Sequence, residues 1–178
     1  MKPRRERLRK VIARVVSHLE ERYRIPVTFG NMPPPFIGDL DGREIFVDQD
    51  QNPELTLFTL VHLFGHTVQW NLSGHAPDIG TKEPRTYSAE DLVEVAAYER
   101  DASRYGLKLL HDIGAADLDQ WLADFSAADT GYLLHYYTTG EKGSPVACWR
   151  SGQPLLEPLE IPAFTPIRFR RRLGGVVI

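Results

Sequence analysis

Cysteine and long apolar runs are what this sequence of 178 residues most clearly lacks. Its one cysteine, Cys148, has no second thiol to pair with, which excludes an internal disulfide. No stretch approaches the roughly 20 consecutive apolar residues that cross a bilayer. The basic first ten residues lead into charged amphipathic sequence and not into the apolar core of a signal peptide. These absences predict a cytoplasmic protein with no membrane segment.

A strong net charge is also lacking, since the formal net charge is −3. The positive charges nevertheless gather near the two ends, at Lys2, Arg4, Arg5, Arg7, Arg9, Lys10, Arg168, Arg170, Arg171 and Arg172. Such clusters suit either a solvated helix face and tail or contacts with nucleic acid. We favour the solvated interpretation because the whole chain is slightly acidic. Nucleic-acid contact remains the weaker alternative.

The length of the chain and its 42% hydrophobic content suit one domain that buries a substantial core. We expect an α+β domain over residues 1–140. Proline recurs beyond Gly140, at Pro145, Pro154, Pro158, Pro162 and Pro166. This recurrence predicts that no helix forms there and that residues 141–178 are an extended segment packed on the same domain.

Residues 4–23 carry apolar side chains at three- and four-residue spacing, which predicts an amphipathic helix. Residues 25–30 and 43–49 are rich in β-branched and aromatic side chains and are bounded by glycine or proline. They therefore predict two short strands. Between them, residues 31–42 have the composition of a turn-rich loop. Together these segments predict a small sheet.

Two further helices have clear start signals. Asn52 followed by proline predicts a helix that runs to about Asn71, because asparagine caps free backbone N–H groups and proline suits the first helical position. Ser88 with Asp91 predicts the start of a second long helix. The glycine- and proline-rich loop between them is expected to border a functional site. Residues 117–140 predict one or two shorter helices.

His62 and His66 lie four residues apart within the first of these helices. This spacing places both imidazoles on one helix face, one turn apart, where they can share a tetrahedral metal ion. The pattern alone is weak, because two packed or surface histidines produce it equally well. A third candidate ligand in the second helix strengthens the metal interpretation.

That third candidate is Glu99, which falls within a small and apolar helical stripe. The stripe comprises Leu92, Ala96, Ala102, Ser103, Gly106 and Leu110. A carboxylate on such a face is expected to be buried, which costs several kcal/mol unless a cation or hydrogen-bond donors compensate it. A metal held by the two histidines is one such partner. An ion pair with Arg104 or Arg85 is the alternative.

Two segments resemble the ImmA/IrrE group of zinc metallopeptidases. FTLVHLFGH, residues 58–66, is similar to the metal helix of that family, which typically contains HExGH. ERDASRYGLKLL, residues 99–110, is similar to the segment that carries the family's ligand glutamate. The likeness covers about residues 8–110. It implies a zincin-like fold with a small sheet, and one zinc ion bound by His62, His66 and Glu99.

The sequence departs from this family at Leu63. In HExxH enzymes a glutamate at this position is the general base that activates the metal-bound water, and leucine cannot accept a proton. Glu94 is a poor replacement, because it lies about 140° around the helix from Glu99. Other accessory candidates are His75, His135 and Tyr136, none of which the sequence fixes in space.

Three hypotheses follow for the function. We favour a zinc-binding, metallopeptidase-like protein, a pseudoenzyme that acts in regulation by binding a polypeptide or regulatory protein. The second hypothesis is an active metallopeptidase that uses an unconventional acid or base to cleave a regulatory protein. The third is a nucleic-acid or transcription-partner module that uses the basic ends of the chain.

Overall fold

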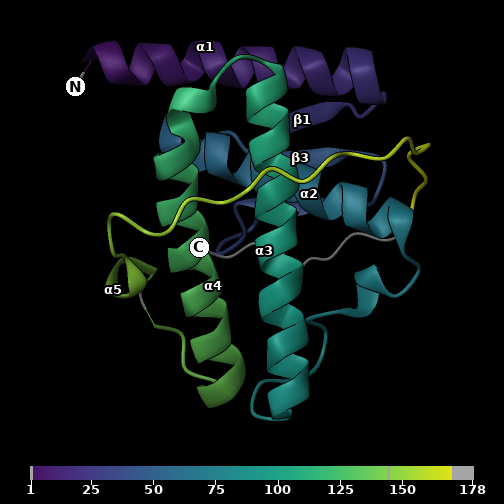
Figure 1. Ribbon diagram of the computed structural model, residues 1–178, viewed down its shortest axis with the longest axis vertical. Coiled ribbons are helices and arrows are strands. Elements are labelled where there is room, and N and C mark those ends of the chain that lie inside the picture. Colours follow the sequence, from purple (N-terminus) through teal and green to yellow (C-terminus); the bar gives the residue numbers. More distant parts are fainter. Residues whose placement is uncertain (1, 144, 170–178) are drawn as a thin grey trace.

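The computed structural model describes residues 2–143 and 145–169, and these form an α+β fold of helices around one three-stranded sheet (Figure 1). In chain order the elements are α1 (Lys2–His18), η1 (Leu19–Tyr23), β1 (Val27–Gly30), β2 (Gly38–Leu40), β3 (Ile45–Asp48), α2 (Pro53–Leu72), η2 (Ala76–Asp78), α3 (Ala89–Asp112), η3 (Ala116–Leu118), α4 (Asp119–Thr139) and α5 (Pro145–Cys148). Among the described residues, no helix combines the length and apolar character that crossing a membrane requires.

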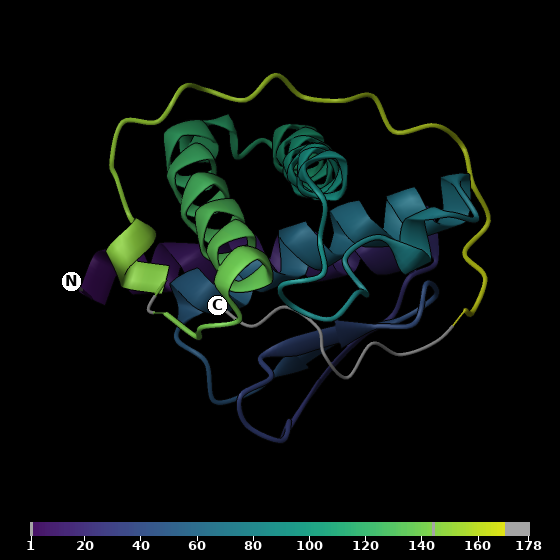
Figure 2. The same ribbon diagram turned by 90° about the horizontal axis from the view of Figure 1, so that it is seen from below.

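Helix α2 is the centre of the molecule. Figure 2 shows the sheet on one side of α2 and helices α3 and α4 on the other. Every residue from Thr56 to Val68 is buried, because neighbours surround this stretch on all sides. The helix begins as the sequence predicts, with the side chain of Asn52 accepting hydrogen bonds from the backbone N–H groups of Glu54 and Leu55.

The sheet has the order β1-β3-β2, with β1 parallel and β2 antiparallel to β3. The predicted strands correspond to β1 and β3, but β2 lies within residues 31–42, where the prediction of a loop was wrong. Glycine and aspartate are poor strand formers, so the local sequence hides this strand. Close packing against α2 explains the glycine. A Cβ atom at Gly38 would stand 2.8 Å from the side chain of Leu63, so glycine lets the strand approach the helix this closely.

Helices α3 and α4 pack side by side over α2 (Figure 2). The capping box predicted at Ser88 and Asp91 is confirmed and begins α3. Residues 119–139 form one continuous helix, where the sequence predicted one or two short ones. Its buried face against α3 compensates for the weak helix propensity of Gly131. A hydrogen bond of 2.7 Å between the hydroxyls of Ser126 and Ser103 joins the two helices.

Two glycines allow α2 and α3 to approach closely. A Cβ atom at Gly65 would stand 2.0 Å from the carbonyl oxygen of Ala102. A Cβ atom at Gly106 would stand 2.8 Å from the carbonyl oxygen of Val61. Both distances are far below van der Waals contact, so only glycine fits at these crossings. This approach places Glu99 beside the two histidines of α2.

The prediction that no helix forms beyond Gly140 was wrong, because Pro145–Cys148 form α5. Proline begins this helix, at the position where its missing N–H costs nothing. Residues 149–169 form neither helix nor strand and cross over α3 (Figure 1). The N–H of Leu159 donates to the carbonyl oxygen of Arg104 at 3.2 Å, and Arg168 forms an ion pair with Asp41. Arg170, Arg171 and Arg172 lie outside the described residues.

Candidate functional site

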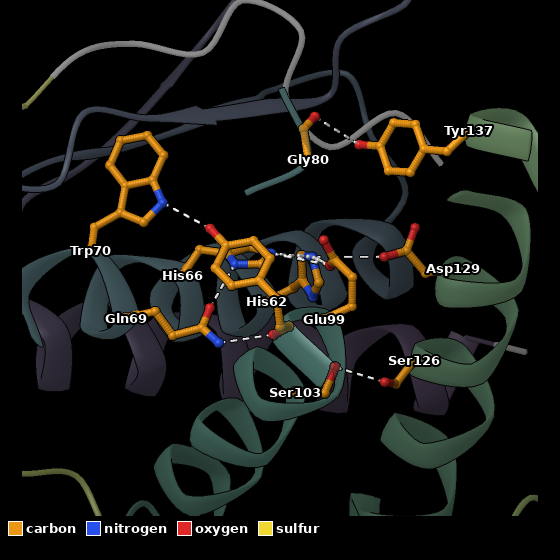
Figure 3. Close-up of polar contacts among 11 residues, drawn as sticks. His62, His66, Gln69, Trp70, Gly80, Glu99, Ser103, Ser126, Asp129 and Tyr137 are labelled. Atoms are coloured by element: carbon orange, nitrogen blue, oxygen red, sulfur yellow. Dashed lines mark hydrogen bonds and ion pairs between the residues drawn. The ribbon is translucent and has the colours of Figure 1, made fainter. Parts of the chain in front are cut away.

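His62 and His66 on α2 and Glu99 on α3 meet in the interior (Figure 3). Their Nε2 and Oε2 atoms are separated by 3.0 Å between the histidines and by 3.2 Å from each histidine to the glutamate. The three residues are 2%, 5% and 6% exposed. Within the described part of the chain, they are the one group of three or more potential metal ligands found close together.

These three short contacts cannot all be hydrogen bonds. Each Nε2 atom carries at most one hydrogen, in the plane of its ring, and an ionised carboxylate carries none. If both Nε2 atoms donate to Glu99, two N–H groups oppose each other at the 3.0 Å contact. If either is unprotonated, its lone pair faces a carboxylate at 3.2 Å. A cation among the three atoms satisfies all of them at once.

Gln69 sets the tautomer of His66. The side-chain amide of Gln69 donates to the carbonyl oxygen of Tyr98 at 2.8 Å, which turns its own oxygen toward His66. That oxygen lies 2.9 Å from Nδ1 of His66 (Figure 3), so Nδ1 must carry the hydrogen. The neutral imidazole then presents a bare lone pair at Nε2, as a metal ligand must. An outer partner of this kind accompanies most histidine ligands.

The two histidines also favour the ionised form of Glu99. Burial acts to raise the pKa of Glu99, but His66 and His62 outweigh it and hold that pKa well below its ordinary value. The carboxylate is therefore ionised. It needs a positive partner in the interior, since an uncompensated buried charge is strongly unfavourable.

Neither arginine considered from the sequence is that partner. Arg104 bonds to Asp101 at 3.0 Å and to the carbonyl oxygen of Glu157. Arg85 bonds to the carbonyl oxygen of Thr139. The two histidines are the basic groups beside Glu99.

The dimensions of the group fit a small tetrahedral metal ion. Zinc binds histidine nitrogen and carboxylate oxygen at about 2.0–2.2 Å, which places neighbouring ligand atoms about 3.3–3.6 Å apart in a tetrahedron. The observed triangle has edges of 3.0–3.2 Å. A small outward movement of each side chain thus accommodates the ion. The structure identifies a group able to hold a metal and does not by itself select zinc.

Leu63 is fully buried and packs toward strand β2 near Gly38. Its side chain fills the space between α2 and the sheet. Tyr98 lies against His66, with the ring centroids 4.4 Å apart, and its hydroxyl accepts a hydrogen bond from Trp70 at 2.8 Å. Aromatic rings therefore cover both histidines, since Phe58 stacks on His62 with the ring centroids 5.3 Å apart.

The accessory candidates from the sequence lie apart from this group. His75 is exposed and bonds to Glu94 at 2.9 Å, so both side chains are engaged on the surface. His135 is exposed near Gly143. Tyr136 contacts Tyr137, with the ring centroids 5.8 Å apart. The loop after α2 is tied to α4 by the hydroxyl of Tyr137, which donates to the carbonyl oxygen of Gly80 at 3.2 Å (Figure 3).

Asp129 on α4 is a residue that the sequence analysis missed. Its Oδ2 atom lies 3.7 Å from Nε2 of His62 (Figure 3), and the side chain is 2% exposed. Burial, opposed by His62 and reinforced by Glu99, raises the pKa of Asp129 to about 7. The spacing of Leu122, Phe125, Asp129 and Tyr132 could have revealed it, because an acidic residue interrupts an apolar helix face.

Comparisons of the chain with protein-family models, with curated proteins and with solved structures found no significant match.

Proposed function

We propose that this protein binds one divalent metal ion, best suited to zinc, through His62, His66 and Glu99. The observation that carries this proposal is the buried triangle of two imidazole nitrogens and one carboxylate oxygen, with edges of 3.0–3.2 Å. Nitrogen and oxygen ligands in tetrahedral geometry are typical of zinc, although other divalent ions accept the same donors. The hydrogen bond from His66 to Gln69 supports it independently.

We further propose that the protein acts through binding rather than hydrolysis. Peptide hydrolysis at zinc needs a proton acceptor beside the metal-bound water, and Leu63 takes the position of that acceptor in the HExxH pattern. Its side chain is buried in apolar packing. The enclosure of the three ligands by Tyr98 and neighbouring groups also leaves little surface for a polypeptide substrate at the metal.

The biological role that fits this combination is regulation by binding a polypeptide or a regulatory protein. The support is the resemblance of residues 58–66 and 99–110 to the metal and glutamate segments of ImmA/IrrE proteins. In such a role the metal stabilises the fold that presents the binding surface, because binding free energy at a formed site adds to folding free energy. A zincin-like architecture belongs to the same proposal.

Nucleic-acid binding through the basic ends is a weaker candidate. Arg168, one of the basic residues near the C-terminal end, forms ion pairs with Asp41 at 2.7 Å and with Glu44 at 3.0 Å. It is therefore already neutralised within the protein.

Zinc binding is tested by thermal unfolding of the chain with chelator and with added zinc. At a free zinc concentration of about 100 Kd the stabilisation is about 2.7 kcal/mol, which raises the Tm by about 5–10 °C for a protein of this size. His66→Ala should abolish the shift. The matched control is His75→Ala, which removes an exposed histidine and should preserve it. An unchanged Tm of the wild-type chain at millimolar zinc would refute the binding proposal.

Absence of hydrolysis is tested with the zinc-loaded wild-type chain on unstructured polypeptides. General-base catalysis is typically worth about 10²- to 10⁴-fold, so we expect no cleavage above that of the chelator-treated chain. Leu63→Glu is the complementary variant. Robust, chelator-sensitive cleavage by the wild type, abolished by His62→Ala, would instead establish the active metallopeptidase. Asp129, whose Oδ2 lies 3.7 Å from Nε2 of His62, would then be the first residue to test as its base.

A further inference from the structure

We propose that Asp129 is the fourth protein ligand of the metal site and closes its coordination sphere. This inference rests on the proposed function, since it presupposes that His62, His66 and Glu99 bind the ion. It adds a donor from α4, so that one ion links three helices of the molecule. It also changes the character of the site, from one with an open position to one filled by protein.

The position of Asp129 relative to His62 supports a direct role. A carboxylate that only orients a histidine ligand bonds to the ring nitrogen that does not bind the metal. Asp129 instead faces Nε2 of His62, the atom that also faces His66 and Glu99. Nδ1 of His62 has no hydrogen-bond partner among the described residues. The aspartate therefore points at the metal position and not at the far side of the ring.

The burial of Asp129 also indicates that its carboxyl group has a cation as partner. Asp129 is 2% exposed, and neither of its oxygens has a hydrogen-bond partner in the part of the chain that the structure describes. A buried carboxyl group with both oxygens unpaired is strongly unfavourable, so its retention in the interior needs a partner. The nearest basic group is His62, at 3.7 Å. A cation bound between them supplies the missing partner.

The distance from Asp129 to His62 is close to that between two ligands of one ion. At 3.7 Å it exceeds the tetrahedral ligand separation of about 3.3–3.6 Å by only a few tenths of an ångström. Asp129 does not belong to the group formed by the other three residues, whose ligand atoms are all within 4.8 Å of one another, so it stands farther from at least one of them. Binding as a fourth ligand therefore requires the carboxyl group of Asp129 to move toward the other three residues. Figure 3 shows its carboxyl group directed toward this group from α4.

The test uses the full chain loaded with cobalt(II), whose visible spectrum reports the number and type of ligands. Azide is added to each sample, because a small anion enters an open coordination position but not one filled by protein. We expect no spectral change on adding azide to the wild-type chain. Asp129→Ala should take up azide with a clear spectral shift. Its Kd for zinc should rise at least about 10-fold, because loss of a ligand weakens binding no less than loss of an outer hydrogen-bond partner does.

Asp124→Asn is the matched control. It alters another buried aspartate of α4, whose Oδ1 accepts hydrogen bonds from Gln120 and from the backbone of Gln153. Its cobalt spectrum and azide response should equal those of the wild type. The wild-type titration decides the question even if Asp129→Ala does not fold.

Two results separate the inference from the proposed function. If azide shifts the spectrum of the cobalt-loaded wild type, the fourth position is open and the role of Asp129 as a ligand is overturned, while the three-ligand site stands. If the wild-type chain binds neither cobalt nor zinc, the proposed function fails, and the inference falls with it.

Discussion

At the scale of single residues, Gln69 is the side chain that most sharply separates a metal ligand from an ordinary packed histidine. It accepts from Nδ1 of His66 while donating to the backbone of Tyr98, which leaves Nε2 of His66 free to bind an ion. A buried histidine that served only in packing would also need a partner for its N–H group, but its affinity for a metal would not depend on that partner. The effect of Gln69 should therefore appear in metal affinity.

We predict that Gln69→Ala raises the Kd for zinc by about 10- to 100-fold, the range measured for loss of such outer partners. Gln69→Glu should restore only part of the affinity, because a carboxylate still accepts from Nδ1 but can no longer donate to the carbonyl oxygen of Tyr98. A competition titration with a chromophoric chelator measures both values. Gln49→Ala, which changes an exposed glutamine bonded to Asn31, is the control. Equal zinc affinities for Gln69→Ala and wild type would show that metal binding does not depend on the hydrogen bond between Gln69 and His66.

The sequence predicted some of these residues better than others. The burial of Glu99 followed from the small and apolar side chains at helical spacing around it, and the structure confirms that burial. Asp129 offered the same signal on α4 but was missed, because residues 117–140 were divided into short segments in which no continuous face was visible. Gln69 carried no signal, since its role depends on the position of Tyr98 across the helix pair.

At the scale of elements, the crossing of α2 and α3 controls whether the site can form. Gly65 lies between His62 and His66 on one helix and contacts Ala102, one turn beyond Glu99, on the other. Gly106 makes the next crossing contact, with Val61. Since the obstructing atoms are backbone, a side chain at either position must push the helices apart.

We predict that Gly65→Ala lowers the free energy of unfolding by about 2 kcal/mol or more and weakens zinc binding, because overpacking separates Glu99 from the histidines. Gly131→Ala is the matched helical control. Its Cβ would stand 3.6 Å from the nearest atom, so the gain in helix propensity of up to about 1 kcal/mol should prevail. Urea unfolding and a zinc titration measure both variants. A Gly65→Ala chain as stable as wild type would show that the helices do not approach so closely.

The helices were predictable because their signals are local. Asn52 and Ser88 supply caps, and apolar periodicity follows each of them. Strand β2 was not predictable, because Gly38 and Asp39 form a strand only through pairing with Val47 and Phe46 of β3. Helix α5 lies where the recurrence of proline predicts no helix. Proline is well tolerated in the first turn, so the frequency of proline is a weaker signal than its position in the helix.

At the scale of the whole molecule, segments far apart in the sequence enclose the site. Residues 149–169 cross α3 and reach the sheet, where Arg168 and Phe169 bond to Asp41 and Phe169 packs against Trp70. Trp70 in turn bonds to Tyr98, which lies against His66. The course of residues 149–169 depends on contacts between distant parts of the chain. The sequence could therefore predict an extended segment but not where it lies on the domain.

The most direct test of the account is the metal content of the purified full chain, prepared without chelator and measured by elemental analysis. We expect about one zinc ion per chain. Glu99→Ala and His62→Ala should lose most of that zinc, while His75→Ala should keep it, because His75 is exposed and paired with Glu94. A wild-type chain with no transition metal, which also fails to take up added zinc at micromolar concentration, would contradict the central claim.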